Sequence, residues 1–254
     1  NLNFTRNRGE VISIREGIDE VVLYENFTGI TYKFVPGQAV GTLYGYDFNR
    51  DENGNLIIGS DGFPSVNRDE LKPMGNALPN FTAGLTNSFQ YKNVGLSVLL
   101  EWRDGGDVYD LGLRNSIRNG LLAMTERRYE QVIFNGVTET GEPNTQPVEI
   151  NGETLYRSFG RYNSAAPILL EDASWFRIRR ASIFYDLPQS LFGKGEYIRG
   201  ARLSLTGNNL FINTPFRGYD PETNYFGAGS NIRGFTGLQT PGVTTYVLSL
   251  NVTF

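Results

Sequence analysis

The chain has 254 residues, a net charge of −4, no cysteine and no histidine. The lack of histidine excludes Ser-His-Asp triads and histidine-ligated zinc sites, the lack of cysteine excludes disulfides and thiolate metal sites, and the acidic balance argues against nucleic-acid binding. The 30 glycines and 13% aromatic residues favour a β-rich protein. No apolar run is long enough for a transmembrane helix, but this does not exclude a membrane β-barrel, whose strands give a much weaker sequence signal.

The N-terminal third is predicted to contain short strands separated by turns. Asn1–Arg6 alternates like the end of a strand, and residues 7–38 hold short β-like pieces that end at Pro36-Gly37. Val40–Phe48 is predicted as a second strand, with large side chains on one side and two glycines and an aspartate on the other. The polar stretch Asp51–Asn55 contains Asn-Gly, which favours a type I′ hairpin turn.

The clearest hairpin covers Asn80–Arg103. Two strands of about ten residues alternate between apolar and small or polar side chains, and Lys92-Asn93 turns the chain between them. About ten residues is what a tilted strand needs to cross a bilayer. Tyr91 and Trp102 lie at opposite ends of the apolar face, as an interfacial aromatic girdle requires. A soluble sandwich with one wet face is the alternative interpretation.

A long connection, Gly105–Ala173, follows the hairpin. It contains a Gly/Pro/Asn-rich stretch and a possible amphipathic helix around Leu113, Ile117, Leu121 and Met124. The next strand, Ser174–Leu187, changes the phase of its alternation near Arg179-Arg180, which predicts a β-bulge there.

Two further strands complete the chain. Ile198–Asn208 alternates regularly, Leu210–Gly242 is predicted as a loop, and Val243–Phe254 is a strand with one apolar and one largely polar face. Connections are short after Tyr91 and Leu187, and long elsewhere, which is typical of outer-membrane barrels with short periplasmic turns and long extracellular loops. By parity, the segment 7–38 is then expected on the periplasmic side.

The predicted strands number about seven, whereas bacterial single-chain barrels use even numbers of at least eight. We therefore expect residues 1–254 to be the C-terminal part of a single, larger transmembrane antiparallel β-barrel domain. The terminal strand would pair on its free side with a strand that lies outside these residues.

Successive motifs, in order and over essentially the whole chain, resemble the SusC/RagA family of TonB-dependent outer-membrane transporters. They are Val40–Tyr46, Gly75–Leu85, Tyr91–Asn93, Gly105–Tyr109, Trp175–Arg180, Tyr185–Pro188, Asn208–Phe211 and Gly218–Glu222. Asp110 departs from the pattern, which has Asn there.

The resemblance implies a 22-stranded barrel with a plugged lumen in the Gram-negative outer membrane, surrounded by lipid, of which this chain holds the last seven strands. The family's N-terminal extension, TonB box, plug and earlier strands are absent from these residues, so contact with TonB would be made by that missing part. It further implies a SusD-like surface lipoprotein as partner and import of oligosaccharides or peptides.

Candidate chemical sites are weak. Asp51–Asn55 lacks the glycine offset and the bidentate glutamate of an EF-hand, so a plain turn is favoured. Asp104, Asp107 and Asp110 are interpreted as loop residues rather than paired catalytic carboxylates. The loop aromatics are expected to pack within the loops; they are Tyr109, Phe216, Tyr219, Tyr225 and Phe226. No catalytic, cofactor or metal residue is assigned, and ligand-binding residues are left unassigned.

Three hypotheses follow for the function. The leading one is energy-coupled import, with this chain forming barrel wall and extracellular loops and no enzymatic activity. The first alternative is a SusC-like barrel that serves as a scaffold in a larger outer-membrane assembly. The second is a soluble β-rich glycan-binding module or hydrolase, which would require the parent protein to be water-soluble.

Overall fold

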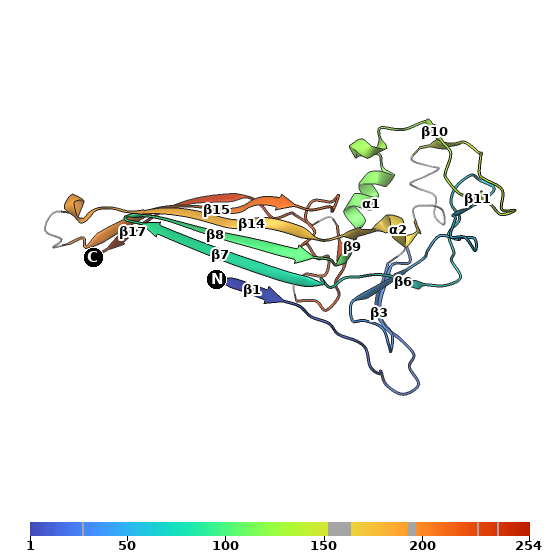
Figure 1. The fold of residues 1–254 in the computed structure, drawn as a ribbon, viewed down its shortest axis with the longest axis horizontal. Coiled ribbons are helices and arrows are strands. Elements are labelled where there is room, and N and C mark those ends of the chain that lie inside the picture. The colour runs from blue at the N-terminus through green and yellow to red at the C-terminus, as the bar shows by residue number, and fades with distance from the viewer. Residues whose placement is uncertain (27, 152–163, 193–196, 228, 238) are drawn as a thin grey trace.

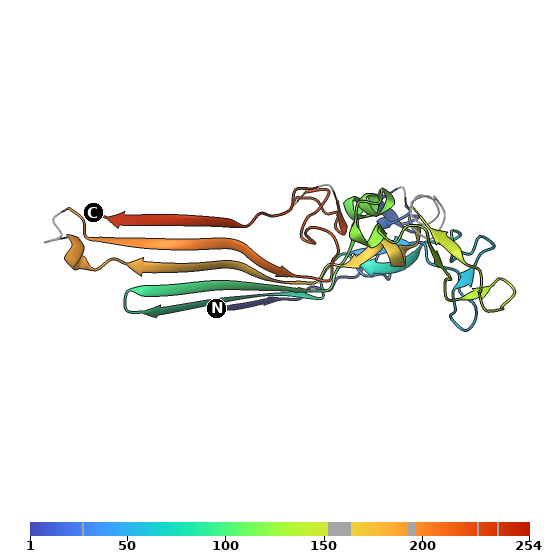
Figure 2. The same ribbon diagram turned by 90° about the horizontal axis from the view of Figure 1, so that it is seen from above.

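The computed structural model describes residues 1–26, 28–151, 164–192, 197–227, 229–237 and 239–254. Figures 1 and 2 show two parts: a long sheet, which we call the wall, and a body of short elements at one end of it. The wall has six antiparallel strands in the order β1-β7-β8-β14-β15-β17. Their bounds are β1 Leu2–Thr5, β7 Phe81–Tyr91, β8 Val94–Asp104, β14 Trp175–Asp186, β15 Gly200–Asn213 and β17 Thr245–Thr253.

The register of the wall gathers apolar side chains on one face. Leu96 of β8 pairs with Ile183, Ile183 with Leu205, and Leu205 with Leu248, so one apolar row crosses four strands. These four side chains are 41–71% exposed, and no element in the described part of the chain covers them. Apart from Asn87 near mid-height, polar side chains on this face lie only at the ends of the strands.

The opposite face of the wall is mostly polar, with Leu99, Phe184 and Val247 among its exceptions. The rows next to the apolar ones carry hydroxyl pairs: Ser88 Oγ lies 3.2 Å from Ser97 Oγ, and Ser182 Oγ lies 2.8 Å from Thr206 Oγ1. The alternation predicted from the sequence is therefore confirmed, because strict period-2 geometry sends successive residues to opposite faces.

Aromatic rings form a row across the body end of the apolar face. Phe4 stacks on Phe81 with ring centres 5.4 Å apart, and Trp102 lies edge-on to both Phe81 and Phe176 at 6.4 Å. Tyr91, 75% exposed, lies at the other end. The 11 residues of β8 extend about 37 Å, or roughly 28 Å when tilted by about 40°, which matches the ~25 Å apolar band of an outer-membrane barrel.

The connections are short at one end of the wall and long at the other. Tyr91 pairs with Val94 across the two-residue turn, and a second turn joins β14 to β15 at the same end. The connections β1–β7, β8–β14 and β15–β17 all lie at the body end (Figure 1). Since β1 pairs directly with β7, the segment 7–38 belongs to the body end, and its predicted periplasmic position is wrong.

The wall contains six strands of this chain rather than seven, because the strand predicted at Val40–Phe48 belongs to the body. There, β4 (Thr42–Gly45) is buried within a four-stranded sheet of order β2-β3-β4-β6. A Cβ on Gly45 would lie 2.6 Å from the Ala166 Cβ, so this glycine permits close packing rather than lining a lumen. Alternation alone does not distinguish the two environments.

The body consists of small sheets and two short helices. The three-stranded sheet has the order β13-β9-β16, β10 pairs with β12, and β5 pairs with β11. The bounds are β2 Val21–Glu25, β3 Thr31–Phe34, β5 Ile57–Ile58, β6 Lys72–Asn76, β9 Asp107–Asp110, α1 Leu111–Arg118, η1 Ala123–Thr125, β10 Glu130–Val132, β11 Val137–Thr138, β12 Val148–Ile150, α2 Ala166–Leu169, β13 Leu170–Asp172 and β16 Phe235–Thr236. At the far end of the wall, η4 spans Gln189–Phe192.

The largest hydrophobic core lies in the body, not in the wall. Its buried members are Ile30, Tyr32, Leu43, Ala77, Tyr109, Ala166, Leu169 and Phe235. The predicted helix is confirmed for Leu113 and Ile117 in α1, but α1 ends at Arg118 and Leu121 is 74% exposed beyond it. No helix among the described residues is long and apolar enough to cross a membrane.

The polar turn at Asp51–Asn55 is present, but it is not type I′. Only Gly54 has a positive φ, +83°, whereas type I′ requires a positive φ at Asn53 as well. The Gly54 N–H donates to the Asp51 carbonyl, and the Asp51 carboxylate accepts from the Asn53 and Asn55 amides. The Asp51 carboxylate thus stabilises the turn by accepting hydrogen bonds from backbone N–H groups within it.

Candidate functional site

A β-bulge in β14 places consecutive arginines on the polar face of the wall. Ile178 pairs with Leu100 of β8, but the next pair is Arg180 with Leu99, so Arg179 is an extra residue. The register against β15 shifts at the same place. The predicted bulge is confirmed, and it directs both Arg179 and Arg180 to the polar face while Ile178 and Ala181 keep to the apolar one.

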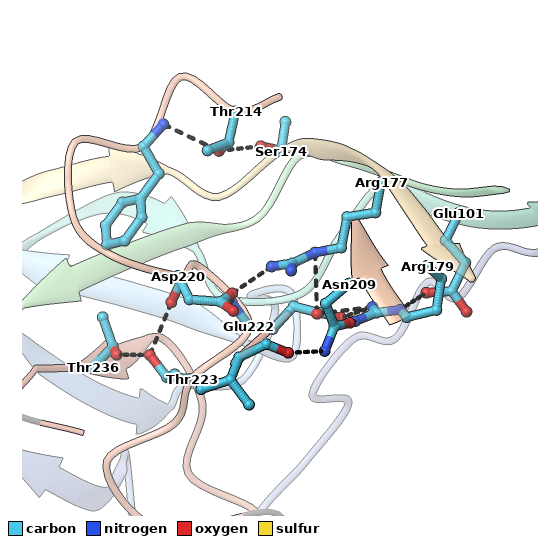
Figure 3. Close-up of polar contacts among 12 residues, drawn as sticks. Glu101, Ser174, Arg177, Arg179, Asn209, Thr214, Asp220, Glu222, Thr223 and Thr236 are labelled. Carbon is cyan, nitrogen blue, oxygen red and sulfur yellow. Dashed lines mark hydrogen bonds and ion pairs between the residues drawn. The ribbon is translucent and has the colours of Figure 1, made fainter. Parts of the chain in front are cut away.

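Arg179 joins two strands of the wall to the β15–β17 connection. Its Nε donates to Glu101 Oε2 of β8 at 2.5 Å, and its Nη2 lies 2.8 Å from both carboxylate oxygens of Glu222. Its Nη1 donates to Asn209 Oδ1 of β15 at 3.2 Å (Figure 3). Asn209 has a φ of +51°, so strained backbone on β15 faces the bulge on β14.

Arg177 makes the more deeply buried contacts of this network. Its Nη2 donates to Asp220, and its Nε lies 3.2 Å from Glu222 Oε2 (Figure 3). The side chains of Arg177 and Asp220 are 6% and 10% exposed. Removing one partner from such a buried pair costs about 3–5 kcal/mol, because the other charge stays buried and uncompensated.

The Trp175 ring forms one side of the network. The guanidinium carbons of Arg177 and Arg179 lie 5.0 and 5.5 Å from its centre, within cation–π range. Trp175 is buried on the polar face and follows directly after the body strand β13. The network therefore lies where the wall meets the body.

A small polar cavity of about 60 Å³ adjoins this network. Arg103, Asp107 and Glu222 are among its lining residues, and Arg103 donates to the Ala77 and Gly105 carbonyls at 3.2 and 3.3 Å. A polar space of this size is suited to ordered water.

The three aspartates near the start of the β8–β14 connection serve separate structural roles. Asp104 accepts from the Asn80 side chain at 3.0 Å, Asp107 accepts from the Asn76 N–H at 2.7 Å, and Asp110 caps α1 through the Leu113 N–H at 3.0 Å.

Burial raises the pKa of Asp107 and of Asp110, and the backbone hydrogen bonds that each accepts partly oppose the shift. Among the described residues, no group of three or more His, Cys, Asp or Glu side chains is placed to hold a metal ion. The interpretation of the aspartates as loop residues rather than a catalytic pair fits these contacts.

The loop aromatics divide into two groups. Tyr109, Phe216 and Phe226 pack into the body, as expected. Tyr225 is 50% exposed although its ring contacts Phe226, and Tyr219 is 83% exposed. Tyr219 therefore does not follow the expected packing.

The chain was compared with protein-family models, curated proteins and solved structures. No family model matches. TonB-dependent receptor P3 of Formosa agariphila is 25% identical over 99% of this chain and 26% of its own length, and receptor P26 of the same organism is 30% identical over 80% of the chain and 19% of its length. A third, receptor P39, is 26% identical over 93% and 23%. The chain thus spans about a quarter or less of these relatives.

Solved structures described as the RagAB peptide importer share the fold. The closed-closed state aligns over 100% of this chain and 27% of its own, with a TM-score of 0.67 and 20% identity. The open-open state gives 0.67 at 19% identity. Together with the ordered motifs and the two-faced wall, these comparisons make the chain similar, along essentially its whole length, to part of a TonB-dependent receptor of the SusC/RagA type, and its wall has the fold of a portion of that β-barrel.

Proposed function

We propose that residues 1–254 form the C-terminal part of the barrel and several extracellular loops of an outer-membrane, TonB-dependent nutrient importer. The observation that carries this proposal is the wall itself. It has one exposed apolar face bounded by aromatic rings, one polar face, and a length suited to the apolar band of a bilayer. A soluble β-rich module would leave this apolar face in water, which is costly over so large an area.

In this proposal the apolar face contacts lipid and the polar face lines a hydrated lumen. The turn at Lys92-Asn93 is then periplasmic, and the body is extracellular, since all of its connections leave the same end of the wall. The body would shape the entrance to the barrel and contact a SusD-like lipoprotein. A plug and a TonB box would be supplied by parts of the protein outside these residues.

The cargo is proposed to be oligopeptides or oligosaccharides. The RagAB structures are described as those of a peptide importer, which supports peptides as the first class to test. The network of Arg177 and Arg179 does not select between the two classes, because its charges are already paired within the chain.

The test uses the full-length parent protein in its own host. Deletion of its gene should abolish uptake of one labelled class, peptide or oligosaccharide, and removal of TonB should have the same effect. A SusD-like lipoprotein should co-purify in mild detergent. Recovery of the parent in the aqueous phase would contradict the membrane assignment, and a stable assembly without any TonB-dependent uptake would favour the scaffold instead.

A further inference from the structure

We propose that the β15–β17 connection is a strap with an ionic latch, which is attached permanently to the body and releasably to the wall. The strap comprises the described residues 214–227, 229–237 and 239–244. The latch is the set of contacts that Asp220 and Glu222 make with Arg177 and Arg179. The latch rests on these contacts alone, whereas its position beside a transport passage rests on the proposed function.

The attachment of the strap to the body is largely apolar. Phe235 belongs to the body core and pairs with Tyr109 as β16 joins β9. Phe226 packs edge-on to Tyr24 and Phe235, with ring centres 4.7 and 6.2 Å apart. Two backbone hydrogen bonds of 2.8 Å add to this, from Tyr225 N to the Phe235 carbonyl and from Tyr109 N to the Gly234 carbonyl.

A second contact with the body lies near the start of the strap. Phe216 packs in a small cluster with Val108 and Ala173. Arg217 binds Glu171 of β13 through its backbone N–H at 3.0 Å and its Nη2 at 2.8 Å. The strap is therefore fixed to the body on both sides of Asp220 and Glu222.

At its two ends the strap is tied to the wall by neutral hydrogen bonds, from the Thr214 hydroxyl to the Ser174 carbonyl at 2.7 Å and from the Thr244 hydroxyl to the Asn209 carbonyl at 2.8 Å. Its middle is attached by ionic contacts. Between the two body contacts, the chain presents Asp220 and Glu222 to the polar face of β14, where they meet the guanidinium groups of Arg177 and Arg179 (Figure 3). The turn is held in shape by the Asp220 carboxylate, which accepts from the Glu222 N–H at 2.9 Å, and by the Thr223 hydroxyl, which donates to the Asp220 carbonyl at 2.8 Å.

The difference between the apolar contacts with the body and the ionic contacts with the wall determines which side of the strap detaches. Ion pairs lose their partners by exchange with water and ions, whereas the body contacts require a packed apolar core to open. Opening therefore leaves the strap on the body and exposes Arg177 on the polar face. The neighbouring Arg180 is already exposed there, so the open form presents two cationic groups in the same part of the wall.

Hydrogen exchange of the full-length protein in detergent micelles tests this inference, with Glu222→Gln and Arg177→Gln as variants. Glu222→Gln weakens the latch, and Arg177→Gln removes the guanidinium that pairs with Asp220 and is one of the two that contact Glu222. Exchange in the peptide covering 219–224 should rise roughly tenfold or more in Glu222→Gln and further in Arg177→Gln, because losing a charge-assisted hydrogen bond raises the opening equilibrium by at least that factor. The amides of Tyr225 and Tyr109 should stay protected.

Asp186→Asn is the matched control, because Asp186 of β14 forms a two-point ion pair with Arg202 of β15 at the other end of the wall, away from the strap. It should leave exchange at 219–224 unchanged. Unchanged exchange in Glu222→Gln would overturn the latch, as would equal loss of protection at 219–224, Tyr225 and Tyr109, since the strap would then open as one unit. Should Arg177→Gln fail to assemble, Glu222→Gln alone decides.

Discussion

Deletion of Arg179 tests the bulge and its register most sharply. Because Arg179 is the extra residue between the pairs Ile178–Leu100 and Arg180–Leu99, its removal joins the β8–β14 ladder without a gap. Every later side chain of β14 then keeps its present face. Against β15 the extra residue lies on β15, since Ile178 pairs with Phe211 and Arg180 with Asn208, so the deletion also widens that existing bulge. The wall should assemble. The expected loss is the contacts of Arg179 with Glu101, Asn209 and Glu222, about 1.5–3 kcal/mol for charge-assisted bonds of a side chain that is 26% exposed, together with the cost of the wider bulge.

Deletion of Ser182 from the same strand is the comparison. It either turns Ile183 and Tyr185 away from the apolar face or forces Arg180 onto it. Loss of burial of two large side chains costs roughly 3–6 kcal/mol, and an arginine facing lipid costs about 2–4 kcal/mol near the midplane. Assembly is measured in the full-length protein by heat-modifiable gel migration and thermal unfolding. If deletion of Arg179 impairs assembly as severely as deletion of Ser182, the register argument is refuted.

Three further changes test the apolar face, the packing of the body and the burial of Asp107. Val98→Lys, near mid-height on the apolar face, should destabilise the barrel by about 2–4 kcal/mol, while Ser97→Lys on the polar face should have little effect in the same unfolding assay. Gly45→Val should loosen the body and raise its protease sensitivity without disturbing the wall, since the new Cβ would lie 2.6 Å from that of Ala166. Burial raises the pKa of Asp107 above its ordinary value of 3.8, so the folded body binds this proton more tightly than the unfolded chain. The stabilisation from this proton is present at low pH and is lost as the pH rises through the raised pKa. Asp107→Asn should therefore flatten the pH dependence of proteolysis of the body in that range.

The faces of the wall were predictable from the sequence because strand alternation is a local property. The phase change near Arg179 was enough to predict the bulge, since only an extra residue reconciles Ile178 with Ala181 on one face. The hairpin turn at Lys92-Asn93 was similarly local, being fixed by the two alternating runs on either side of it.

The arrangement of strands across long connections was not predictable in the same way. Val40–Phe48 alternates as a wall strand would, yet its glycines serve close packing inside the body. The pairing of β1 with β7, which places residues 7–38 at the body end, joins residues about eighty positions apart and leaves no local signal.

The candidate site was missed for a related reason. Its arginines lie on β14, whereas Glu101 precedes Arg179 by 78 positions and Glu222 follows it by 43. The sequence nevertheless contained a clue to this site. Glu101, Arg177 and Arg179 are charged residues on the polar face, near the same end of their strands. Charged side chains that are partly buried need partners of opposite charge nearby.

The most direct test of the central assignment is a spin-label scan along β8 in the full-length protein, reconstituted in lipid. Single cysteines replace the residues from Val94 to Arg103 in turn, and collisions with oxygen and with a water-soluble nickel reagent are measured. A barrel wall predicts a period of two, with Leu96, Val98 and Leu100 accessible to oxygen, and Ser97 and Leu99 accessible to nickel. Uniform access to nickel along the strand, or a period of two with the faces reversed, would contradict a barrel wall.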